Sequence, residues 1–290
     1  MIKTVISIKT ALFTAVVLML CACGTESPKE EPKAAVVVQD TASDAEIPQV
    51  TYSLPSPLQI ASIFKKSGMK YKDGVTSPIK DPLKYRSNLS KSLNLGIYSA
   101  DLCYVVLNKQ QQEAMRYMKL SRQTADKLGM GAVFDQDNLS KRFEKNIGNE
   151  DSLAHIISEL QMVLDTYLDE NNQKQITSIA FAGAWIESLF IASKVFEKNN
   201  EQTLNKKLSE QMTILESILN ALKIEEKKDP AINELIVDLQ GVKNIYDAQS
   251  SEGNADKASG SNEKIKALTD DEIASLITKI QELREKFIKG

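Results

Sequence analysis

Two acidic residues inside apolar helical segments are the strongest candidates for chemistry in this sequence. Asp101 and Glu187 each lie within a run of mostly apolar residues. Carboxylates are costly to bury unpaired, so a cleft that holds both would be a candidate ligand or cation site. Each acid could instead pair with a Lys, an Arg or a Tyr hydroxyl of another helix, or face water. The aromatic members of the candidate cleft are Tyr98, Tyr104 and Trp185.

The remaining inventory of catalytic residue types is sparse. His155 is the only histidine, and it lies in an apolar run without a nucleophile motif, so a Ser-His-Asp or Cys-His relay lacks its parts. One histidine is also too few for the paired Glu-x-x-His ligands of a helical di-metal site. Cys103 lies among apolar residues, which favours a buried and inert thiol. We therefore expect no enzyme activity and no cofactor.

The N-terminal residues are typical of a secretory signal. Lys3 and Lys9 are the only charged residues before an uncharged, mostly apolar run over residues 10–22. This run is short for a permanent transmembrane helix, which needs about 20 apolar residues. We therefore expect residues 1–22 to be a signal peptide.

The end of this segment carries a more specific motif. The residues Leu20-Cys21-Ala22-Cys23 resemble the lipobox of bacterial lipoproteins, in which a small residue precedes the lipidated cysteine. The resemblance implies that cleavage follows Ala22, that Cys23 receives fatty acids such as palmitate, and that Cys21 leaves with the signal peptide. Several acyl chains bind a bilayer stably, because each buried methylene contributes about 0.8 kcal/mol. The mature protein is then anchored to the lipid bilayer without spanning it.

The residue after the lipidated cysteine bears on the location. Gly24, rather than Asp, resembles the outer-membrane sorting pattern of enteric lipoproteins. The resemblance implies a bacterial cell envelope and its outer membrane, with the periplasmic or surface face left open. Without residues 1–22 the chain carries 34 basic and 39 acidic residues, a net charge of −5. There is no basic surplus for nucleic acid.

Composition divides the mature chain into three kinds of segment. Residues 23–53 are rich in acids and proline with almost no aromatic residues, which predicts a disordered acidic tether. A helical domain is expected over residues 54–249, and a Ser, Gly and Asn-rich flexible linker over residues 250–267. Residues 268–290 form an amphipathic C-terminal helix.

The helical domain contains apolar stripes at helical spacing, separated by short polar turns. We expect an all-α fold of about eight helices without a sheet, either an antiparallel helical bundle or an irregular array of αα-hairpins. Ser56 and Gln59 predict a capping box at the first helix. The further helices are expected near residues 85–107, 110–128, 137–148, 151–170, 173–198, 201–224 and 230–249.

Two of these helices are centred on a glycine. A glycine inside a helix costs stability, so it usually has a packing reason. Gly96 and Gly183 lack a Cβ atom and could each allow a neighbouring backbone to pack closely. Superposing the two glycines also aligns Tyr98 with Trp185, at an offset of 87 residues, which is consistent with either a duplication or chance. Residues 95–128 also loosely resemble a tetratricopeptide repeat in Leu-Gly followed by an aromatic residue. No tandem copies follow at the period of 34 residues, so an irregular αα-hairpin is expected.

The C-terminal helix has three possible roles. Thr269 and Glu272 predict its capping box. Its apolar face covers only two heptads, so it could dock on the domain, bind a partner or fray. The face consists of Ile273, Leu276, Ile280, Leu283 and Phe287.

Two functions remain from these observations. The first is a lipid-anchored, non-enzymatic module that binds or scaffolds another envelope protein in a groove between helices. The second is a small-molecule-binding or hydrolytic protein that uses Asp101 and Glu187. The second requires both carboxyl groups to line an open cleft, and burial of both behind salt bridges would exclude it.

Overall fold

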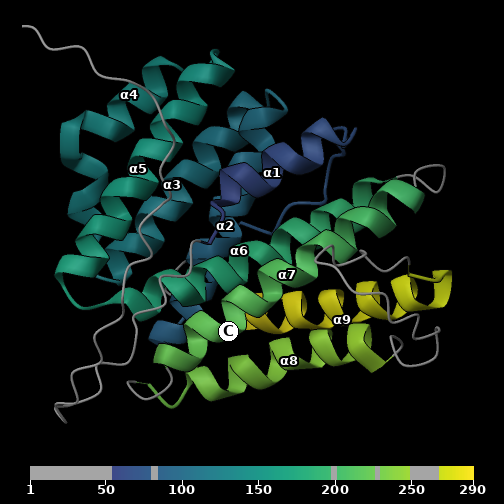
Figure 1. Cartoon of the computed structure of the whole chain (residues 1–290). Helices are drawn as coiled ribbons and strands as arrows, with labels where there is room; N and C mark the ends of the chain where they lie inside the picture. Colours follow the sequence, from purple (N-terminus) through teal and green to yellow (C-terminus); the bar gives the residue numbers. More distant parts are fainter. Residues whose placement is uncertain (1–53, 80–83, 197–200, 226–228, 249–267) are drawn as a thin grey trace, which may run out of the picture. The chain divides into compact units, whose positions relative to one another are not determined.

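The computed structural model describes residues 54–79, 84–196, 201–225, 229–248 and 268–290, which belong to one compact unit (Figure 1). These residues contain nine α-helices and no strand, which confirms the predicted all-α class. The expected signal peptide, tether and linker lie outside them. The helices are α1 (Pro57–Lys66), α2 (Asn88–Leu107), α3 (Gln111–Lys127), α4 (Leu139–Lys145), α5 (Glu150–Glu170), α6 (Lys174–Val195), α7 (Glu201–Glu225), α8 (Ile232–Ala248) and α9 (Asp270–Lys289).

Helix ends follow local capping. Capping boxes start α1 at Ser56 and α9 at Thr269. The helix expected from Tyr85 starts later, because the side chain of Ser87 accepts a hydrogen bond from the Ser90 amide at 3.0 Å and caps α2 there. The helix expected from residue 137 begins at Leu139, since the two preceding residues have left-handed φ angles and end the 3₁₀ helix η2 (Gly131–Asn138).

Helices α2 and α6 form the centre of the fold. Their mutual packing is the most extensive in the described part of the chain, although three helices separate them in sequence. Both are apolar on nearly all sides, as expected for helices that neighbours surround. Among the described helices, only α6 is long and apolar enough to cross a membrane, and most of it is buried inside this fold.

The two glycines make this close packing possible. A Cβ atom on Gly96 would lie 1.7 Å from the carbonyl oxygen of Ala180, and one on Gly183 would lie 2.1 Å from that of Leu93. Leu93 and Ala180 are 87 residues apart, as Gly96 and Gly183 are. The two contacts are therefore equivalent positions of α2 and α6 under the offset noted in the sequence. The two helices therefore cross as a locally symmetric pair, with a glycine from each at the crossing.

Helices α2 and α6 run parallel to each other. Their C-terminal ends both meet α1, where Lys65 donates a hydrogen bond to the carbonyl of Leu107 and the rings of Phe64 and Phe196 lie 6.2 Å apart. Sequential helices such as α2 and α3 or α7 and α8 also pack together, as expected. The central parallel pair was not expected from a pattern of sequential antiparallel neighbours.

Helix α9 docks on the helical body. It packs against α6, α8 and α2, and the five apolar residues of its predicted face are buried. The side-chain amide of Asn94 on α2 donates to the carbonyl oxygen of Phe287 at 2.8 Å. In Figure 1, α9 is the yellow helix beside α8. Docking is thus the outcome that the structure shows among the three left open by the sequence.

Candidate functional site

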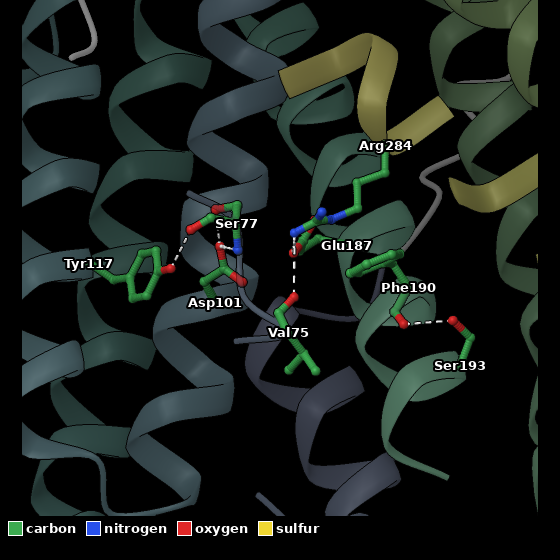
Figure 2. A network of polar contacts seen from close by, with 8 residues as sticks. All are labelled: Val75, Ser77, Asp101, Tyr117, Glu187, Phe190, Ser193 and Arg284. Carbon is green, nitrogen blue, oxygen red and sulfur yellow. Dashed lines mark hydrogen bonds and ion pairs between the residues drawn. The ribbon is translucent and has the colours of Figure 1, made fainter. Parts of the chain in front are cut away.

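The structure brings Asp101 and Glu187 together but buries both. Each residue has 0% of its surface exposed. Arg284 of α9 forks onto Glu187, with Nε at 2.6 Å from Oε2 and Nη2 at 2.8 Å from Oε1 (Figure 2). Such bidentate pairs are strong and geometrically specific. The predicted open cleft around these carboxyls is absent from the described part of the chain, because a helix remote in sequence covers them.

The Arg284 guanidinium is largely buried and lies over an aromatic ring. Its Cζ lies 3.8 Å from the ring centroid of Phe190, in a cation–π arrangement, and Nη2 lies 3.4 Å from the carbonyl oxygen of Val75. Only 11% of the side chain is exposed. Burial in this setting makes the arginine depend on Glu187 as its counter-charge.

Asp101 faces a different set of partners. Its Oδ2 accepts hydrogen bonds from the backbone amide of Ser77 at 3.1 Å and from the Ser77 hydroxyl. The hydroxyl of Tyr117 donates to the carbonyl oxygen of Ser77 at 2.5 Å, which holds the loop in place (Figure 2). The second carboxyl oxygen, Oδ1, has no donor partner.

The surroundings of the carboxyl pair shift the pKa of each member. Burial, followed by the charge of Glu187, raises the pKa of Asp101 well above its ordinary value. Burial also raises the pKa of Glu187, but the Arg284 fork opposes this shift. The two carboxyls therefore differ in their surroundings: Glu187 has Arg284 as a paired counter-charge, and Asp101 has no such pair, which favours its neutral form.

The aromatic residues of the predicted cleft lie in the core and have separate partners. The hydroxyls of Tyr98 and Tyr85 are 3.0 Å apart, and the hydroxyl of Tyr104 accepts from the amide of Lys72 at 2.7 Å. The indole of Trp185 donates to Gln211 at 3.1 Å. All three predicted residues are at most 1% exposed, so they support the fold around the carboxyl pair and leave no access to it.

The other candidate groups offer little chemistry. His155 is exposed on α5. Cys103 is buried, as the sequence predicts, and burial raises the pKa of its thiol to about 12, which leaves it unreactive. Among the described residues, no group of three or more His, Cys, Asp or Glu side chains is arranged to hold a metal ion.

A cavity of about 110 Å³ lies between α2, α5 and α6, apart from the carboxyl pair. Its walls are mostly aliphatic and aromatic, with contributions from α1, α3 and η2 as well. The polar residues on its lining are Ser99, Ser121, Gln161, Asp165 and Thr177, and the thiol of Cys103. Apolar cavities with a few polar groups are the usual form of small-molecule sites.

Three important residues were not recognised from the sequence. Arg284 lies on the apolar stripe of α9, four positions after Ile280 and three before Phe287, and a cation on an apolar face could have indicated a buried counter-charge. Ser77 lies in a loop without periodicity, so no pattern connected it with Asp101. The Ser121 hydroxyl on α3 gave no signal either.

These features define an all-α protein with a closed ionic core and a separate apolar cavity. Comparisons with protein-family models, with curated proteins and with solved structures give no match. The residues of this chain are therefore the basis on which its function is inferred.

Proposed function

We propose that this protein is a lipid-anchored, non-enzymatic component of a bacterial envelope that binds or scaffolds another envelope protein. The anchor is Cys23, on the strength of the lipobox resemblance over residues 20–23. The helical body then acts beside the membrane, at the distance that residues 23–53 allow.

One observation carries the non-enzymatic part of the proposal. Asp101 and Glu187, the best candidates for acid–base chemistry, are both 0% exposed, and they pair with Ser77 and Arg284 respectively. A general acid or base must reach its substrate directly or through one water molecule. The closed pair instead supports a structural role, which disfavours the alternative of a hydrolytic or ligand-binding carboxylate cleft.

The anchor is tested by substituting the two N-terminal cysteines separately. We expect Cys23→Ser to abolish acylation and release the chain from membranes. Cys21→Ser is the matched control, since that residue leaves with the signal peptide, and it should be acylated normally. Intact-mass analysis and membrane fractionation measure both. Normal membrane attachment of Cys23→Ser, without any acyl modification of the wild type, would contradict the proposal.

Partner binding is tested in native envelopes by crosslinking followed by affinity purification and mass spectrometry. A defined envelope protein should be recovered with the wild-type chain and lost when Cys23→Ser is used. Recovery of no partner, or hydrolytic activity that Asp101→Asn abolishes, would reject the binding role.

A further inference from the structure

The cavity between α2, α5 and α6 has a distinct floor and rim. Met130, Phe134 and Cys103 are almost fully buried and form part of its apolar floor. Gln161 and Asp165 of α5 lie on its lining and reach solvent, so they form the rim. A molecule that enters would place its apolar part inward and its polar part near these residues or near a polar group on the wall.

One such wall group lacks a partner. Ser121 of α3 lines the cavity with 2% of its surface exposed, and its hydroxyl has no hydrogen-bond partner. Buried hydroxyls nearly always have one, because an unpaired polar group is costly in an apolar setting. Ser99, on the same lining, already donates to the carbonyl of Leu95 at 2.7 Å. Ser121 is therefore the wall group left available to a ligand.

The rim disfavours an anionic ligand. Among the described residues on the lining, Asp165 carries the only acidic side chain, and no Lys or Arg accompanies it. Partial desolvation raises the pKa of its carboxyl, although the side chain reaches solvent at the rim. A carboxylate such as that of a fatty acid would meet this acid without a counter-charge.

We propose that this cavity binds a compact, uncharged apolar molecule with one hydroxyl group, of the phenol class, whose hydroxyl pairs with Ser121. The volume is of the order that holds a single ring, since apolar cavities of roughly 150 Å³ bind benzene. This site goes beyond the proposed function, and it depends neither on the lipid anchor nor on a protein partner.

The test uses the purified full chain in lipid nanodiscs, with empty nanodiscs as the blank for partition into lipid. Fluorine NMR follows three probes of similar ring size: 4-fluorophenol, fluorobenzene and 4-fluorobenzoate. We expect saturable binding of 4-fluorophenol, weaker binding of fluorobenzene, and at least tenfold weaker binding of 4-fluorobenzoate. Absence of saturable 4-fluorophenol binding, or equal binding of the benzoate, would overturn the proposal.

Variants locate the binding. Ser121→Ala should weaken 4-fluorophenol about fivefold, the effect of one hydrogen bond, and leave fluorobenzene unchanged. Leu164→Trp, which places a large ring on the cavity lining, should abolish binding of both probes. Met162→Trp is the matched control on the same helix, because Met162 is 64% exposed and does not line the cavity. Circular dichroism verifies folding.

Either of two results would overturn the assignment even if the probes bind. Unchanged binding in a folded Leu164→Trp chain would place the probes elsewhere. Equal effects of Ser121→Ala on 4-fluorophenol and fluorobenzene would remove the role of the hydroxyl. If Leu164→Trp fails to fold, Ser121→Ala decides between these outcomes by its selectivity for 4-fluorophenol.

Discussion

Arg284 and Glu187 form a buried, two-point ion pair between the last helix and the centre of the fold. The residues are 97 positions apart, and their atoms meet at 2.6 and 2.8 Å. The pair fixes the rotation of α9 about its axis as well as its position, because a bidentate fork tolerates little misalignment. The same contact helps to close the carboxyl pair to solvent. Docking of α9 therefore also removes solvent access to Asp101 and Glu187.

Removal of either charge should be strongly destabilising. Glu187→Gln leaves the Arg284 guanidinium buried without a counter-charge, and we expect a loss of about 3–5 kcal/mol in the free energy of unfolding. Chemical denaturation measures it. Glu285→Gln is the matched control on α9, since Glu285 and Lys289 form a largely exposed pair at 3.3 Å. That change should cost less than about 1 kcal/mol.

Replacing both members of the buried pair should lower the free energy of unfolding by less than the sum of the two single substitutions. In Glu187→Leu with Arg284→Met, no unpaired charge remains in the core, and apolar replacements of buried ion pairs are often tolerated. A double-mutant cycle in denaturant measures the coupling. Strictly additive effects would show that the two side chains do not depend on each other.

The glycine crossing should tolerate no side chain. Gly96→Ala would place a methyl group 1.7 Å from the Ala180 carbonyl oxygen, so we expect a loss of at least about 1–3 kcal/mol. Gly241→Ala is the control, because its Cβ would meet only the flexible end of Lys279 at 3.2 Å. That substitution should be neutral or stabilising by up to about 1 kcal/mol. Thermal unfolding compares them, and equal stability of the two variants would argue against the crossing.

Asn94 should help to hold the end of α9. Its side-chain amide donates to the carbonyl oxygens of Ser90 and Phe287, each at 2.8 Å. Asn94→Ala frees the Phe287 carbonyl near the helix end, and a loss of about 1–3 kcal/mol is expected. Hydrogen exchange should accelerate in the last turn of α9 while α3 stays protected. Unchanged exchange in α9 would contradict this role.

The sequence predicted helices better than their arrangement. Ser56 and Thr269 mark the starts of α1 and α9, because a capping box depends only on residues three positions apart. Gly96 and Gly183 indicated close backbone approach for the same local reason, since a bare Cα leaves space for a neighbour. These signals are readable because their physical cause lies within one helix.

The site depended on contacts that no local pattern encodes. Asp101 and Glu187 could be recognised as acids in apolar helices. Arg284 follows the predicted linker in sequence, and only the packing of its helix brings it to Glu187. The parallel pairing of α2 and α6 similarly depends on where the intervening helices place α6. Local signals in the sequence therefore left the choice between an open cleft and a closed pair undecided.

The most direct test of the closed carboxyl pair is the pH dependence of stability in Asp101→Asn. Because folding raises the pKa of Asp101 above 3.8, the unfolded chain releases this proton at lower pH than the folded chain does. Wild-type stability should therefore fall relative to Asp101→Asn as pH rises from about 4 through the folded pKa, since asparagine mimics the protonated acid. Denaturant unfolding across this range should show the two curves diverging; parallel curves would contradict a raised pKa of Asp101 in the folded chain.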